Sequence, residues 1–117
     1  MTSDMAAQHE ANVALVAQRV ELGDAPHVPR PLDHLVVVPR RHAAAVQTDL
    51  VALGFRVDGV GRGLRRVRIE FSRIDAADVD TADASSQQIF DVVDRHGGEY
   101  DGWSGYLAAD PADAPEA

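Results

Sequence analysis

The chain has no cysteine and no lysine, and aromatic residues make up only 5% of its 117 positions. Without cysteine, disulfide bonds, thiolate catalysis and cysteine–zinc sites are excluded. No apolar run approaches the roughly 20 residues that span a bilayer. The N-terminus carries Asp4 and Glu10 where a secretory signal has a basic region. We therefore expect a cytoplasmic protein that contacts no membrane.

The charge of the chain is strongly one-sided. Nineteen acidic side chains stand against eleven basic ones, which gives a formal net charge of −8. A general nucleic-acid binder neutralises phosphates with a basic surface, so we expect no direct binding of nucleic acid. The acidic balance is compatible with docking on a basic surface of a partner protein. Solubility alone is the more common reason for such a charge.

The length and an apolar content of 45% predict one domain with a single modest core. The N-terminal part, residues 1–24, reads as a helix, and three prolines make residues 25–31 an extended linker. The main domain is expected over residues 32–109, followed by a disordered tail over residues 110–117. Within these bounds, capping residues and apolar periodicity predict helices over 3–22, 41–53 and 81–96, and strands over 32–38, 55–60, 65–74 and 99–108.

After the first helix, the order is strand, helix, strand, strand, helix, strand. That order defines an α+β, ferredoxin-like βαββαβ sandwich, here with an additional N-terminal helix. In this arrangement the first and third strands lie in the centre of the sheet, and both helices of the βαββαβ unit pack on one face of it. The unbroken apolar run at residues 35–38 predicts a strand buried on both faces. In the first helix, Val13, Val16 and Val20 predict the apolar stripe.

The only tryptophan and both tyrosines lie within residues 100–106, among several glycines. Alternation along the last strand places Trp103 on one face, and Tyr100 and Tyr106 on the other. We expect Trp103 to face the helices and both tyrosines to lie on the opposite face, where they could anchor a partner. As an alternative to a contact role, Asp101 beside Gly102 could cap a turn.

The third strand adds a second candidate surface, because Arg66, Arg68 and Glu70 alternate with its apolar residues. The N-terminal helix could equally cover this face. RNA recognition on such a sheet needs stacking aromatics on the central strands, which are absent here. Glycines over residues 59–63 resemble a phosphate loop superficially, but they join two strands, so a flexible hairpin is the better interpretation.

The remaining polar residues indicate no catalytic chemistry. The five histidines show no spacing typical of a metal site, and no serine or carboxylate has the context of a nucleophile with its base. We therefore expect a protein without enzymatic activity, metal or cofactor.

The string Glu99-Tyr100-Asp101-Gly102-Trp103, placed after a helix that ends at residues 96–98, resembles the closing signature of the RraB-type regulators of ribonuclease E activity. The resemblance covers roughly residues 31–108. It implies an α+β sandwich and a non-catalytic regulator that binds ribonuclease E, or a related E/G-type ribonuclease, and inhibits RNA cleavage by protein–protein contact. Many such regulators carry a long acidic tail, whereas this chain ends with only Asp110, Asp113 and Glu116.

For this regulator we predict a monomer or weak homodimer. The predicted partner-binding residues are Tyr100, Asp101, Gly102, Trp103, Tyr106, Arg66 and Arg68. A small-ligand-sensing or dimerisation module of ferredoxin-like fold, with a different partner, is the alternative hypothesis, and a small enzyme is the third.

Overall fold

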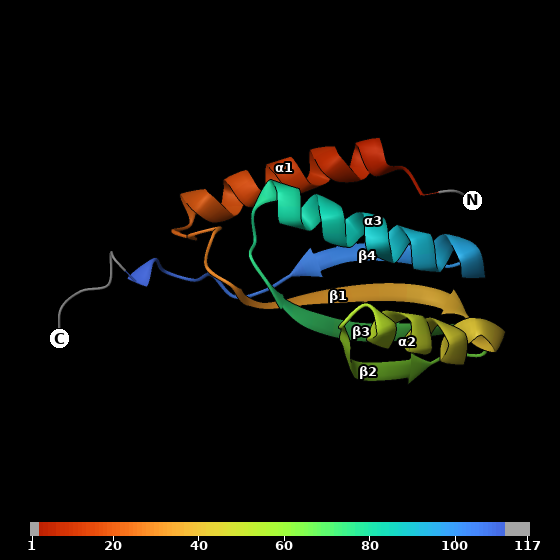
Figure 1. The fold of residues 1–117 in the computed structure, drawn as a ribbon. Coiled ribbons are helices and arrows are strands. Elements are labelled where there is room, and N and C mark those ends of the chain that lie inside the picture. Colours follow the sequence, from red (N-terminus) through yellow and green to blue (C-terminus); the bar gives the residue numbers. More distant parts are fainter. Residues whose placement is uncertain (1–2, 112–117) are drawn as a thin grey trace.

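The computed structural model describes residues 3–111, and its three helices and four strands follow one another in the predicted order (Figure 1). Within this part of the chain, no helix is both long and apolar enough to cross a lipid bilayer. Most of the predicted tail, from residue 112 on, lies outside the described residues. The elements are α1 (Met5–Glu21), β1 (Arg30–Pro39), the 3-10 turn η1 (Arg40–His42), α2 (Ala43–Ala52), β2 (Arg56–Arg62), β3 (Arg66–Asp75), α3 (Val79–His96) and β4 (Glu99–Ser104).

Several element boundaries differ from the sequence-based expectation. Strand β1 begins at Arg30, inside the predicted linker, and β2 continues through the glycines to Arg62. Strand β4 stops at Ser104, so Tyr106 lies beyond the sheet. Helix α3 begins earlier than predicted because Asp78 caps it by accepting from the Thr81 amide at 2.7 Å.

The four strands form one sheet in the order β2-β3-β1-β4, with every neighbouring pair antiparallel. The central pair, β1 and β3, runs in uninterrupted register from Arg30 opposite Asp75 to Pro39 opposite Arg66. The predicted central position of the first and third strands is therefore confirmed.

The main core lies between the sheet and the helices α2 and α3. Alternate residues of β1 and β3 point into it, because side chains of a strand alternate between its two faces. At the end of α3, Gly98 packs so closely that a Cβ atom there would lie 2.7 Å from Val38 Cγ1, which explains why glycine is needed. Fully buried members of this core include Val36, Val38, Val46, Leu50, Val67, Ile69, Phe71, Ile89 and Val93.

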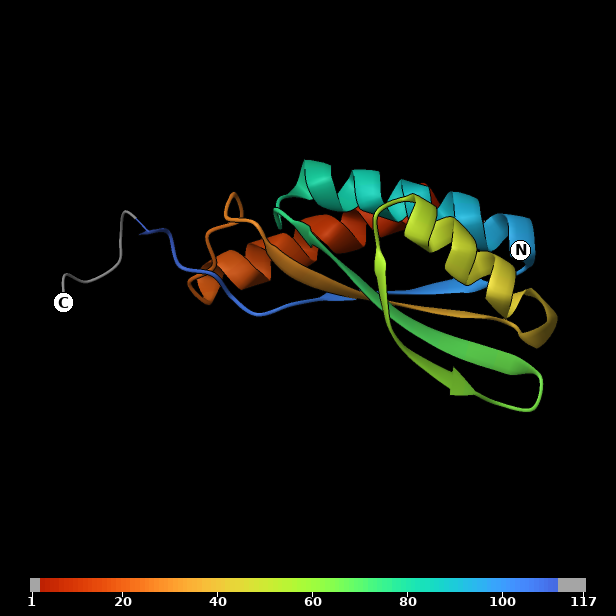
Figure 2. The ribbon, with the colours of Figure 1, turned by 60° about the horizontal axis from the view of Figure 1, so that its bottom comes forward.

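The expectation that β1 is buried on both faces is wrong. Val36 and Val38 are buried, but Leu35 and Val37, which point the other way, are only half-buried. The reason is visible in Figure 2: the helices lie on one side of the sheet and leave the opposite side bare. This uncovered side is the only place where β1 can expose apolar side chains.

Helix α1 packs beside α3 on the helix side of the sheet, so it does not cover the bare face (Figure 1). The predicted stripe is also wrong in part, because Val13 and Val20 are 43% and 48% exposed. The buried residues of α1 are Asn12, Val16 and Arg19. The polar side chains of Asn12 and Arg19 thus lie on the buried side of α1, where valines were expected. They are buried because their hydrogen-bond partners lie on α3 and beyond β4.

Candidate protein-interaction surface

Strand β4 is interrupted by a β-bulge. His34 lies opposite Trp103 and Val36 lies opposite Tyr100, so Leu35 alone faces both Asp101 and Gly102. Gly102 has φ +87°, a left-handed conformation that residues with a Cβ atom rarely adopt. The extra residue shifts the alternation by one position. As a result, Tyr100 and Trp103 point to the same side of the sheet, toward the helices.

Trp103 therefore belongs to the core and is not available to a partner. It is 8% exposed and packs with Val16 and Leu32. Its indole Nε1 donates to Asn12 Oδ1 at 3.0 Å, and the Arg19 guanidinium lies 5.4 Å from the ring centroid. The predicted orientation of Trp103 toward the helices is confirmed.

The predicted orientation of Tyr100 toward the bare face is wrong, and the bulge is the reason. Tyr100 is half-buried and its ring meets Phe90 edge-on, with centroids 5.8 Å apart. Its hydroxyl lies 2.7 Å from His34 Nδ1. Burial raises the pKa of Tyr100 well above its usual value, so the hydroxyl stays protonated.

His34, which contacts the Tyr100 hydroxyl, lies among aromatic rings of the core. It stacks on Phe71 at a centroid distance of 5.3 Å and meets Phe55 edge-on at 5.5 Å. Burial, together with the nearby positive charge of Arg73, lowers the pKa of His34 to about 4. The imidazole, which is only 4% exposed, is therefore neutral near pH 7.

The bare side of the sheet, which we call the open face, carries an apolar stripe between charged flanks. In register, Leu35 lies opposite Glu70 of β3 and opposite the bulge of β4, and Val37 lies between Arg68 and Glu99. An apolar centre with a polar rim is the usual anatomy of a protein interface. The open face consists of Asp33, Leu35, Val37, Arg68, Glu70, Glu99 and Asp101.

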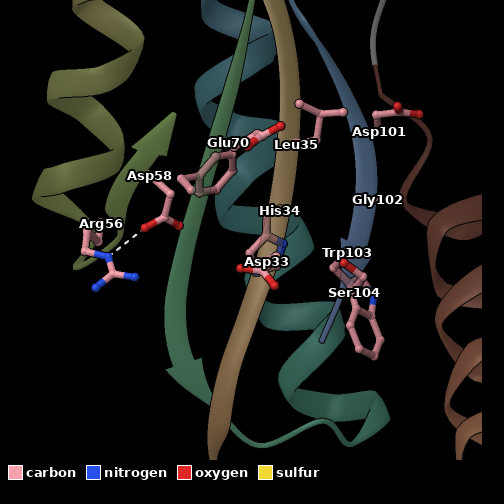
Figure 3. A pocket seen from close by; sticks show the side chains of 11 residues that line it. Asp33, His34, Leu35, Arg56, Asp58, Glu70, Asp101, Gly102, Trp103 and Ser104 are labelled. Carbon is pink, nitrogen blue, oxygen red and sulfur yellow. Dashed lines mark hydrogen bonds and ion pairs between the residues drawn. The ribbon is translucent and has the colours of Figure 1, made fainter. Parts of the chain in front are cut away.

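A shallow depression of about 480 Å³ lies in the open face, centred on β1 (Figure 3). Four carboxylates line it, those of Asp33, Asp58, Glu70 and Asp101. A hydrogen bond from Ser72, and the guanidinium of Arg56 with Nε 2.6 Å from Oδ1, lower the pKa of Asp58. The depression is therefore anionic and suited to a cationic group.

The structure separates the predicted partner-binding residues into four sets. Asp101 and Gly102 line the depression, and Arg66 and Arg68 are exposed on β3 at its far end. Tyr106 is 61% exposed but lies past β4, where its carbonyl accepts from Arg19 at 3.0 Å. Tyr100 and Trp103 are turned away from the open face, as described above.

Sequence reasoning missed the apolar contribution of β1 to this surface. Leu35 and Val37 were assigned to a core that would cover both faces, although an unbroken apolar run on a sheet with helices on one side is equally typical of an exposed stripe. Asp33, Asp58 and Glu99 were also missed. Only the strand register brings them beside that stripe.

The histidine pair His42 and His96 was not predictable from spacing either. Their Nδ1 atoms lie 3.3 Å apart, and His96 Nε2 lies 3.0 Å from Asp49 Oδ2. Over residues 3–111, no group of three or more His, Asp or Glu side chains could hold a metal ion. The pair joins η1 to the end of α3.

Comparison with known proteins bears on what this surface does. No curated protein matches the chain. The sequence model of a family described as "Regulator of ribonuclease activity B" matches residues 9–104, from the first helix to the last residue of β4. The matched region includes the whole open face and the 99–103 segment. The chain therefore belongs to the RraB family, whose members are regulators of ribonuclease activity rather than enzymes.

Proposed function

We propose that the protein binds ribonuclease E, or a related ribonuclease, and inhibits its cleavage of RNA by protein–protein contact, without any catalysis of its own. The observation that carries this proposal is the open face, where the half-buried Leu35 and Val37 lie between charged residues of the neighbouring strands. Family membership supports the regulatory role.

The charge of the depression indicates how inhibition works. An enzyme that binds RNA presents a basic surface to the phosphates. Four carboxylates around one depression match such a surface, so the open face can occupy part of it and exclude RNA. Leu35 and Val37 then supply the dehydrated centre of the contact, and the acidic rim supplies orientation.

We assign the domain to the ferredoxin-like class, on the strength of the two central strands β1 and β3 and of core residues shared by α2 and α3. We also propose a monomer or weak homodimer that acts in the cytoplasm. A monomer at micromolar concentration in sedimentation would support this state, and a tight dimer would contradict it.

The central test replaces both apolar residues of the stripe. The double substitution Leu35→Ser and Val37→Ser should weaken binding to purified ribonuclease E at least about tenfold, because truncated central contacts usually dominate interface energy. The double variant should therefore inhibit RNA cleavage less than the natural protein does. The matched control is Val51→Ser, on the outer side of α2, where the side chain is 58% exposed. Full inhibition by the double variant would reject the open face as the docking surface.

Tyr106 allows a second test of the contact. Because its side chain is 61% exposed, Tyr106→Ala should leave the melting temperature nearly unchanged. If the segment after β4 belongs to the contact, the same variant should weaken partner binding in a titration. A lowered melting temperature would instead show that the ring packs on the domain.

One observation favours the alternative of a small-ligand module. A volume of about 480 Å³ lies within the roughly 300–1,000 Å³ typical of ligand sites. Such sites are mostly apolar, however, whereas this one has four carboxylates. Thermal-shift measurements with cationic metabolites would separate the two functions, since a specific shift is expected only for a ligand module.

A further inference from the structure

The arginines of the chain fall into two groups. Five of them form ion pairs with aspartate: Arg19, Arg30, Arg56, Arg73 and Arg95. The other six are exposed, and none of them forms an ion pair within the described residues. These six are Arg40, Arg41, Arg62, Arg65, Arg66 and Arg68. In a protein of net charge −8, all the unpaired guanidinium groups are thus found in two short segments.

The two segments meet at one end of the sheet. The turn η1 follows β1 and the hairpin turn joins β2 to β3, and the Arg40 amide donates to the Arg65 carbonyl at 2.9 Å. Residues 34–48 and 59–69 contain no acidic residue. We call this end the arginine tip, made of Arg40, Arg41, Arg62, Leu64, Arg65 and Arg66. Arg68 leads from it to the open face.

The apex of the arginine tip is apolar. Leu64 is 87% exposed, the highest exposure of any large hydrophobic residue in the described part of the chain. The turn beneath it is tight, because the Gly63 amide donates to the Arg66 carbonyl at 2.9 Å and a Cβ atom on Gly63 would lie 2.8 Å from that oxygen. Leu64 is therefore presented on a constrained turn with guanidinium groups on both sides. Figure 2 shows the β2–β3 hairpin extending away from the helices.

We propose that the arginine tip binds an acidic protein segment that carries an apolar side chain for Leu64. An apolar centre with an arginine rim matches the composition of protein interfaces, where arginine is enriched. The sugar-phosphate backbone of RNA would use the guanidinium groups but would leave Leu64 without a partner. The acidic open face also lies beside the tip and repels a long polyanion more than a short peptide. This site goes beyond the proposed function, which uses the open face.

The test compares three fluorescent probes by anisotropy: a short peptide of aspartate and glutamate with two leucines, the same peptide with serine in place of leucine, and a single-stranded oligouridylate of equal charge. The protein variants are Leu64→Ser and the double substitution Arg65→Gln with Arg66→Gln. The double substitution Arg56→Gln with Arg95→Gln is the matched control, because it removes the same charge from exposed arginines that are already paired.

The leucine peptide should bind the natural protein most tightly. The tip double variant should lose about tenfold in affinity, and the control should stay within about twofold. Leu64→Ser should weaken the leucine peptide and leave the serine peptide unaffected. Circular dichroism checks that each variant is folded. The Leu35→Ser and Val37→Ser variant should bind the peptide normally. The experiment can therefore reject peptide binding at the arginine tip independently of ribonuclease binding at the open face.

Three outcomes would overturn the proposal. No binding of the leucine peptide at low salt would reject the site. Tighter binding of the oligouridylate, unaffected by Leu64→Ser, would assign the tip to RNA. Concentration-dependent assembly that the tip double variant abolishes would show that the occupant is the acidic face of a second copy.

Discussion

At the scale of single residues, Gly102 decides which side chains of β4 reach the core. Its φ of +87° permits the bulge that turns both Tyr100 and Trp103 toward the helices. A Cβ atom at Gly102 would meet nothing within 4 Å, so the requirement for glycine is one of backbone conformation and not of space. Within the EYDGW string, Tyr100 and Trp103 therefore face the helices, whereas Glu99 and Asp101 are exposed.

Gly102→Ala should lower the free energy of unfolding by about 1–2 kcal/mol, the cost of a left-handed conformation for a residue with a Cβ atom. Urea denaturation followed by the fluorescence of Trp103 measures it. The control is Gly61→Ala in β2, where the new methyl group makes ordinary contact with Arg68 Cβ at 3.8 Å. Equal losses at both positions would contradict the conformational explanation.

His34 makes stability depend on pH. Its folded pKa is about 4, below the usual 6.5, so the unfolded chain binds a proton more readily than the folded one. The fold therefore has the full benefit of a neutral His34 above pH 6.5 and loses it as the pH falls toward 4. We expect a loss of roughly 1.4 kcal/mol per pH unit in that window. Urea titrations at several pH values measure it, and His34→Leu should flatten the profile.

At the scale of elements, one buried ion pair joins the two ends of the domain. Arg30 Nη1 at the start of β1 lies 2.6 Å from Asp24 Oδ1, and both side chains are fully buried. Asp24 also accepts from the Ala108 amide at 2.8 Å, and Arg19 of α1 lies 3.8 Å from its other oxygen. The helix α1, the connection to β1 and the segment after β4 thus share one carboxylate.

Asp24→Asn should destabilise the domain by about 3–5 kcal/mol, because it leaves the charge of Arg30 buried without its counterion. Burial works to raise the pKa of Asp24, but the Ala108 hydrogen bond and Arg30 lower it overall. The contribution is therefore present above the usual aspartate pKa and disappears as the pH falls through the lower folded value. In contrast, Asp58→Asn breaks a pair whose arginine is 80% exposed and should cost less than about 1 kcal/mol. Chemical denaturation of both variants compares them.

The elements were largely predictable, since caps and alternation in the sequence reflect local geometry. Asp4, for example, caps α1 by accepting from the Ala7 amide. What could not be predicted depends on contacts far apart in the chain. Asn12 is buried because Trp103, Asp83 and Ser86 surround it, and no periodicity within α1 reveals those partners. The bulge at Gly102 was equally unpredictable, because it is defined only by the register in which β4 pairs with β1.

At the scale of the whole molecule, acidic and unpaired basic side chains lie on different parts of the surface, which the net charge alone does not show. The depression in the open face gathers four carboxylates, while the unpaired arginines collect at one end of the sheet. Composition alone therefore gives the acidic balance but predicts neither the place of these carboxylates nor the arginine tip. Both surfaces include residues of the central strand β3 and of the outer strand β2, and β1 and β4 contribute to the depression as well.

The irregularities of the outer strands have a further consequence. Both edges of the sheet carry a register shift, at Asp58 in β2 and at residues 101–102 in β4. A bulged edge cannot continue a regular hydrogen-bond ladder, and such edges protect sheets from aggregation. These shifts therefore disfavour the addition of a strand at either edge. We expect that copies of this protein do not polymerise edge to edge and that a partner binds through the face of the sheet.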